Sequence, residues 1–191
     1  YVQSGGVQLT NVQFNRNHAG QSGGGIYVES AGTVVDHIGG GLGSNQAIDG
    51  AGVFVQDGRY HSTGASLFFN TATGTGGGLI VGGTGVAIIE GTNVSYNQAA
   101  VGGGVFVGMG SSEIFNSTLF SNTANLGGGV YLAQNTSILT LTNAEIDSNQ
   151  AITAGGGLYV ANGVAYFNSG VIRAKSADQG GGIYLNNGVV K

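Results

Sequence analysis

The sequence contains no cysteine, no proline and no tryptophan, and only 7% of its 191 residues are charged. Without cysteine, disulfide bonds cannot hold the fold together. Without proline and a Gly-X-Y period, the chain cannot be a collagen-like triple helix. The 5 Lys and Arg residues are too few to follow a phosphate backbone, so nucleic acid is not expected as a partner. No apolar run reaches the length of about 18 residues that a transmembrane helix needs, and no such segment is expected.

Glycine, by contrast, is abundant, with 40 residues in the chain. An average protein contains roughly 7% glycine. Such an excess often accompanies disorder, but disordered chains combine low hydrophobicity with high net charge. Here 41% of the residues are hydrophobic and the net charge is only −4. These values favour a folded chain with a repetitive architecture.

The glycines gather in seven clusters, each followed by an apolar residue, an aromatic residue (Ile80 in one cluster) and a second apolar residue. The clusters begin at Gly23, Gly50, Gly76, Gly102, Gly127, Gly155 and Gly180, at intervals of 27, 26, 26, 25, 28 and 25 residues. A second motif, an apolar residue three positions before an asparagine, precedes the clusters with the same period. Its asparagines are Asn17, Asn45, Asn70, Asn97, Asn122 and Asn149, and Lys175 takes the seventh position.

Two motifs with one shared period indicate a solenoid, in which each repeat buries its apolar side against its neighbours. Segments such as Ile26-Tyr27-Val28 alternate between inward and outward residues, which is typical of strands. We therefore predict an all-β fold, a single right-handed parallel β-helix of about seven coils of 25–28 residues, with three short strands per coil. Right-handedness follows from the strong preference of parallel crossovers. The prediction treats residues 1–191 as one domain that starts and ends in the middle of a coil.

The six asparagines are predicted to form a structural ladder. Asparagine tolerates left-handed backbone angles and bonds to its own turn, and stacked amides can bond from coil to coil. A further turn-prone position lies six residues before the ladder, at Asn11, Gly64, Gly91, Asn116, Asn143 and Ser169. Both positions would form corners of the coil.

The segment Leu119–Ala124, followed by Gly127-Gly128-Gly129-Val130-Tyr131, resembles the repeat of the polymorphic outer-membrane proteins. That family is marked by Phe-x-x-Asn and Gly-Gly-Ala-Ile motifs, and it occurs in chlamydial autotransporter passengers and other bacterial surface β-helices. Here the third position of the glycine motif is Gly in nearly every repeat, and the Phe is often Leu, Ile or Val. The resemblance implies a bacterial protein located outside the cell or on its surface, often adhesive, and implies no catalytic residue.

Many parallel β-helices act on polysaccharides, so an enzyme is kept as the alternative function. The best cluster for a polysaccharide lyase or glycosidase contains Asp36, Asp57, Arg59 and His61, with His37 nearby. Asp36 and His61 both lie nine residues before a ladder asparagine and should stack. A surface ion pair explains the same residues. No metal site or cofactor is predicted, and the glycine clusters lack the Lys-Ser/Thr of a phosphate-binding loop.

An aromatic side chain recurs at one position of the coil. The predicted stripe contains Tyr1, Tyr27, Phe54, Phe106, Tyr131, Tyr159 and Tyr184, and Ile80 interrupts it. If the flanking aliphatic residues point inward, these rings point outward. Stacking that stabilises the rod and a contact surface for a glycan or another cell-surface partner are compatible roles.

The leading hypothesis from the sequence is an extracellular structural or adhesive β-solenoid, either a subunit of a head-to-tail fibre or the stalk of an adhesin. The repeats at the two ends are partial and no capping element is recognised, so self-association through the terminal coils is expected. An ice-binding solenoid is disfavoured because Thr71, Thr73 and Thr123 do not form a regular threonine face.

Overall fold

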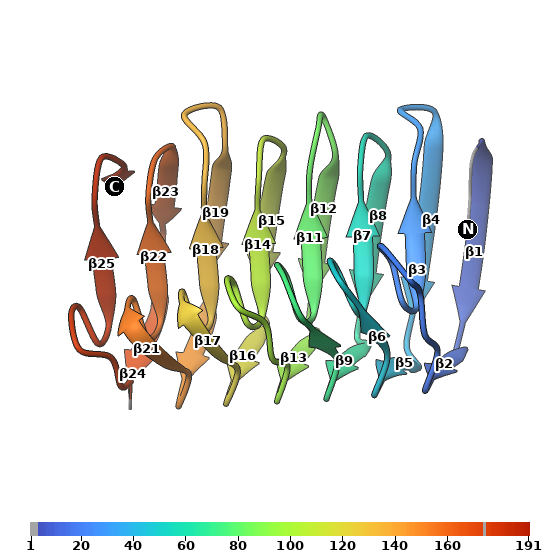
Figure 1. The fold of residues 1–191 in the computed structure, drawn as a ribbon. Helices are drawn as coiled ribbons and strands as arrows, with labels where there is room; N and C mark the ends of the chain where they lie inside the picture. Colours follow the sequence, from blue (N-terminus) through green and yellow to red (C-terminus); the bar gives the residue numbers. More distant parts are fainter. Residues whose placement is uncertain (1–3, 174) are drawn as a thin grey trace.

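The computed structural model describes residues 4–173 and 175–191, and this part of the chain contains strands and no helix. The strands stack into a solenoid of about seven coils, and every strand pairing is parallel (Figure 1). The predicted all-β fold and its coil number are therefore confirmed.

Three sheets run along the whole solenoid. The first sheet contains β1 (Gly5–Thr10), β4 (Thr33–Ile38), β8 (Arg59–Thr63), β12 (Val86–Glu90), β15 (Ser111–Phe115), β19 (Ile138–Thr142), β23 (Val164–Phe167) and β26 (Val189–Val190). The second contains β2 (Gln13–Asn15), β5 (Gly41–Gly43), β9 (Ser66–Phe68), β13 (Asn93–Ser95), β16 (Thr118–Phe120), β20 (Ala144–Asp147) and β24 (Gly170–Arg173). The third contains β3 (Ile26–Val28), β7 (Val53–Val55), β11 (Leu79–Val81), β14 (Val105–Val107), β18 (Val130–Leu132), β22 (Leu158–Val160) and β25 (Ile183–Leu185).

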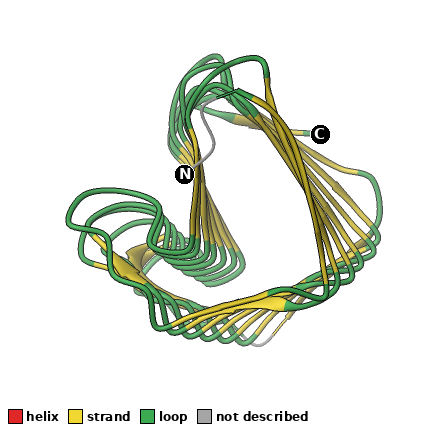
Figure 2. Cartoon of the chain, turned by 90° about the vertical axis from the view of Figure 1, so that its right-hand side faces the viewer, coloured by secondary structure: helices red, strands yellow, loops and turns green. Residues whose placement is uncertain are grey.

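A fourth set of short strands follows the ladder asparagines and adds to the three strands predicted for each coil. It consists of β6 (Gln46–Ala47), β10 (Thr71–Ala72), β17 (Thr123–Leu126) and β21 (Gln150–Ala154). Single parallel bridges at Gln98 join β10 to β17 across the coil between them. These segments form a lobe beside the main triangle of the coil, which Figure 2 shows along the solenoid axis. Seen from the N-terminal end in that view, the chain turns clockwise as it recedes, so the helix is right-handed.

The hydrophobic core lies between the three long sheets and follows the predicted alternation. In β7, Val53 and Val55 are buried while Phe54 between them is half-buried and faces outward. The apolar residues three positions before the ladder stack in register, and Leu42 pairs with Leu67, which pairs with Val94. A small second core of alanines, including Ala47, Ala72 and Ala99, fills the lobe.

The glycine clusters make the tight corner between the lobe and the third sheet. Gly102 has a φ of 66°, in the left-handed region that side chains disfavour. At Gly52 a Cβ atom would lie 2.3 Å from the carbonyl oxygen of Gly78 in the next coil. Glycine is required at such positions because the backbones of adjacent coils approach too closely for any side chain.

Candidate functional site

The ladder asparagines bond from coil to coil, as predicted; all but Asn17 in the first coil are fully buried. Asn45 Nδ2 donates to Asn70 Oδ1 (2.9 Å) and to the carbonyl oxygen of Phe14 (2.8 Å). Asn70 Oδ1 also accepts the backbone N–H of Asn45 at 3.0 Å. The same side-chain bond links all six asparagines, from Asn17 to Asn149. Each inner amide thus satisfies backbone groups of the coil before it, which makes the ladder a structural element.

The predicted backbone role of these asparagines is wrong in one respect. None of the six has a positive φ; the left-handed residue is the one directly before each of them. These residues are Arg16 (φ 60°), Ser44 (56°), Phe69 (53°), Tyr96 (55°), Ser121 (52°) and Ser148 (53°). The turn therefore places its left-handed residue outside and directs the asparagine side chain inward, where its amide groups are used in the ladder. The other predicted corner is left-handed at Asn11, Gly64, Gly91, Asn116 and Asn143, but not at Ser169.

The aromatic stripe has the predicted register and faces outward along the third sheet. Tyr27 pairs with Phe54, and their ring centroids are 5.2 Å apart. A longer stack begins at Phe106, whose ring lies 5.5 Å from that of Tyr131. It continues from Tyr131 to Tyr159 and from Tyr159 to Tyr184, at 4.8 Å each. The buried Ile80 separates the two stacks, and Tyr1 lies outside the described residues.

The structure brings together only part of the predicted acid–base cluster. His61 Nδ1 lies 3.5 Å from Asp36 Oδ1, in the register expected for β4 and β8. Glu90, which the sequence analysis missed, approaches His61 Nε2 from the other side at 3.8 Å. Asp57 belongs to a different corner, where its carboxylate accepts hydrogen bonds from the backbone N–H (2.8 Å) and hydroxyl (3.1 Å) of Thr84.

The two remaining members of that cluster are divided between surface and core. Arg59 is exposed at the start of β8. His37 points into the core, where its Nδ1 lies 2.9 Å from the hydroxyl of Tyr60 and its Nε2 lies 3.4 Å from the carbonyl of Val12. Burial lowers the pKa of His37 and raises that of Tyr60. Both rings are therefore neutral at pH 7, and they form a polar pair inside an apolar core.

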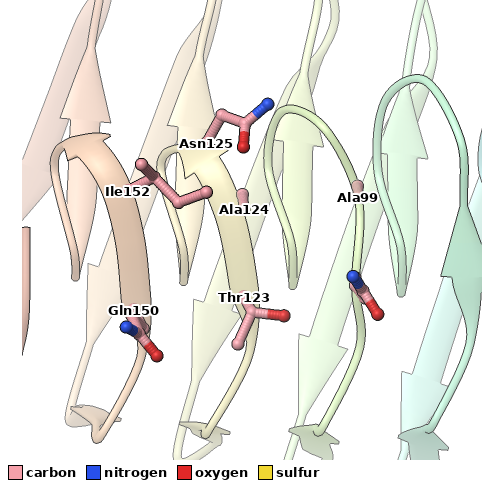
Figure 3. A pocket seen from close by; sticks show the side chains of 7 residues that line it. Ala99, Thr123, Ala124, Asn125, Gln150 and Ile152 are labelled. Carbon is pink, nitrogen blue, oxygen red and sulfur yellow. The ribbon is translucent and has the colours of Figure 1, made fainter.

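The lobe carries a shallow groove, which Figure 3 shows over strands β17 and β21. It is lined by Gln98, Ala99, Thr123, Ala124, Asn125, Gln150 and Ile152. Thr123 pairs with Gln150 in parallel register, so amide and hydroxyl groups succeed each other along one side of the groove. None of the lining residues titrates, and the groove can offer hydrogen bonds but no general acid or base.

Four aromatic side chains meet at the corner between the second sheet and the lobe. This corner cluster consists of Phe68, Phe69, Tyr96 and Phe120. The Phe69 and Tyr96 rings stack with centroids 4.9 Å apart and an interplanar angle of 15°. This cluster was not predicted, although the sequence contains a signal for it: Phe69 and Tyr96 both directly precede a ladder asparagine.

No group of three or more His, Asp or Glu side chains within residues 4–173 and 175–191 is arranged to hold a metal ion. Within the same residues no helix could span a membrane. Comparison with family models, with curated proteins and with solved structures found no match to this chain.

Proposed function

We propose that this protein is an extracellular structural or adhesive β-solenoid of a bacterial surface, of the kind that the polymorphic outer-membrane protein repeat exemplifies. It serves as a subunit of a head-to-tail fibre or as the stalk of an adhesin. The observation that supports this proposal most directly is the asparagine ladder, which couples six successive coils through side-chain hydrogen bonds, all of them buried except the first. Such a ladder stiffens a rod along its axis.

The last coil of the described chain supports an association along that axis. In the third sheet, Leu158 and Val160 of β22 are fully buried, whereas their partners Ile183 and Leu185 in β25 are 37% and 49% exposed. These two side chains repeat the inward pattern of every other coil and differ only in having no coil beyond them to cover them. A further coil, from a second copy or from the same polypeptide, would bury this apolar surface and pair the open strand edge.

Electron microscopy at neutral pH, combined with fibre diffraction, tests the fibre. We expect filaments with a coil spacing of about 4.8 Å along the axis. Leu185→Arg places a charge on the open face of the last coil and should abolish filaments. Met109→Arg is the matched control, because Met109 is 55% exposed on a loop between β14 and β15 at the side of the rod. Discrete rods of one length from the wild-type chain would contradict the fibre.

A carbohydrate-active enzyme is the second candidate, favoured by one observation, the placement of His61 between Asp36 and Glu90 on the outer face of the first sheet. The test is release of reducing or unsaturated sugar ends from a panel of polysaccharides. Turnover by the wild-type chain that His61→Ala abolishes would establish the enzyme and displace the structural proposal. No turnover on any substrate of the panel is the expected result.

A further inference from the structure

The corner cluster is built at a cost in backbone energy. Phe69 and Tyr96 have φ values of 53° and 55°, and bulky side chains rarely adopt this left-handed conformation. Three other coils have serine at the same corner, and that small side chain suffices for the turn. Strained residues of this type cost folding free energy and cluster at functional sites. The turn alone therefore does not account for two large rings at this corner.

The rings of Phe69 and Tyr96 are also exposed to solvent. Phe69 is 55% exposed and Tyr96 is 47% exposed, although both are large and apolar. Phe68 meets Phe69 at 77°, and Phe120 meets Tyr96 at 83°, so an edge-on ring lies on each side of the central stack. The ring of Phe68 extends over β5, where atoms of the ring lie within 3.1 Å of the positions that Cβ atoms of Gly41 and Gly43 would occupy.

Polar side chains border the rings on the same face of the second sheet. Ser66, Asn93 and Thr118 occupy one register position, two residues before the position that contains Phe68 and Phe120. Side chains two residues apart in a strand point to the same face. Leu67, between Ser66 and Phe68, is fully buried, which confirms that its two neighbours face outward. The surface thus combines apolar rings with a row of hydroxyl and amide groups.

We propose that the corner cluster, together with Ser66, Asn93 and Thr118, binds a pyranose ring of a neutral polysaccharide. The aromatic faces carry partial negative charge and suit the C–H face of a sugar ring. The hydroxyl and amide groups beside them can bond to the sugar hydroxyls. This inference rests on the adhesive part of the proposed function and deepens it. The fibre proposal does not depend on sugar binding.

The charge and size of the surface favour this ligand over others. None of its seven side chains is charged. Arg173, which lines a hollow together with Thr118, is paired with Glu145 and Asp147, so an acidic glycan or a nucleic acid would have to compete with two carboxylates for this cation. Because its two central rings are each about half exposed, they offer on the order of 200 Å² of aromatic surface. A stable interface with a second copy needs roughly 800 Å² on each partner.

The test uses the full chain and a panel of neutral polysaccharides: cellulose, chitin, curdlan, xylan and mannan, with alginate and heparin as polyanions. Depletion of the protein from solution measures binding to the insoluble polymers, and affinity electrophoresis measures binding to the soluble ones. The variant Phe69→Asn/Tyr96→Asn removes the central stack. Asparagine accepts a positive φ, so this variant should unfold at the same temperature as the wild type or higher. Tyr166→Asn, which removes an exposed ring from the first sheet, is the matched control.

We expect the wild type and Tyr166→Asn to bind at least one neutral polymer equally well and the double variant to bind it at least about tenfold more weakly. Equal binding by the double variant, or no binding of the wild type to any neutral polymer, would overturn the proposal. So would a wild-type dimer in sedimentation that the double variant dissociates, because a second copy would then occupy the cluster. Filaments seen by microscopy in a chain that binds no polysaccharide would refute the sugar site while leaving the fibre intact.

Discussion

Asn97 Oδ1 accepts hydrogen bonds from both the side-chain amide and the backbone N–H of Asn70. Asn70 Nδ2 donates over 2.9 Å and the backbone N–H of Asn70 donates over 3.0 Å, so one oxygen accepts two hydrogen bonds. Asn97 Nδ2 in turn donates to the carbonyl oxygen of Leu67 at 2.9 Å. A single buried side chain thus satisfies three polar groups of the preceding coil.

Asn97→Ala should therefore be among the most damaging substitutions in the chain. It leaves two donors of Asn70 and the carbonyl of Leu67 without these partners in a buried environment, where each unsatisfied group costs about 1–3 kcal/mol. We expect the free energy of unfolding to fall by about 4 kcal/mol or more in denaturant titrations. Asn125→Ala, at an exposed position in β17, is the control and should change it by less than about 0.5 kcal/mol. A loss at Asn97 as small as that of the control would mean that the ladder does not stabilise the solenoid.

The aromatic stripe should stabilise the rod through ring stacking. Phe106 and Tyr131 stack with an interplanar angle of 2°. In a double-mutant cycle with Phe106→Ala and Tyr131→Ala we expect a coupling of about 0.5–1.5 kcal/mol, measured by chemical unfolding. Phe106→Ala and Tyr184→Ala, at positions three coils apart, should be additive within the error. Additivity in the adjacent pair would favour a contact function of the stripe over a structural one.

The buried His37 should make the stability depend on pH. Burial lowers its pKa in the folded chain from about 6.5. As the pH falls below about 6.5, the unfolded chain therefore binds a proton at His37 more readily than the folded chain does. The free energy of unfolding is then fully retained above about pH 6.5 and is lost as the pH falls below it. Denaturant titrations at pH 7.5 and pH 5.0 measure this loss.

The matched variant for that experiment is His37→Leu/Tyr60→Phe. It removes both polar groups of the pair, so that neither is left buried and unpaired. It should lose less stability between the two pH values than the wild type. His18→Ala, at an exposed position, should retain the wild-type dependence. Equal pH dependence in all three chains would show that His37 does not carry this effect.

Lys175 occupies the seventh ladder position, where only 3% of its side chain is exposed. Burial lowers its pKa to about 8, although Asp147 lies 3.9 Å from Nζ. Lys175→Asn should extend the ladder, because its Oδ1 can accept from Asn149 as the other ladder oxygens do. We expect the free energy of unfolding at pH 7 to rise by about 1–2 kcal/mol.

The same substitution should alter stability at high pH. A lysine whose pKa is lower in the folded chain opposes folding while it is protonated, so the wild type should gain stability between about pH 8 and pH 10.5. Lys175→Asn should lack this gain, and Lys191→Asn, at an exposed position, should keep it. A lower stability of Lys175→Asn at pH 7 would instead show that the ion pair with Asp147 outweighs the burial of the ammonium group.

The architecture could be predicted from the sequence because it is determined by local periodicity. The spacing of the glycine clusters sets the coil length, and one repeated asparagine sets the register, so the pairing of Tyr27 with Phe54 follows from counting residues. The alternation of Ile26, Tyr27 and Val28 likewise decides which side chains enter the core. Where each coil repeats the same motif, stacking in register is the only arrangement that buries every apolar side.

Only the tertiary structure decided what happens at the corners. Whether the left-handed residue of the turn is Asn97 or Tyr96 depends on the path of the backbone around the corner, which no repeat period encodes. That choice directs Asn97 inward to the ladder and places Tyr96 against Phe69 at the surface. The separation of Asp57 from His61 has the same origin, because a residue at a corner leaves the face of the adjoining strand. Periodicity determines which residues share a coil position, whereas turn geometry and side-chain packing determine which of them meet.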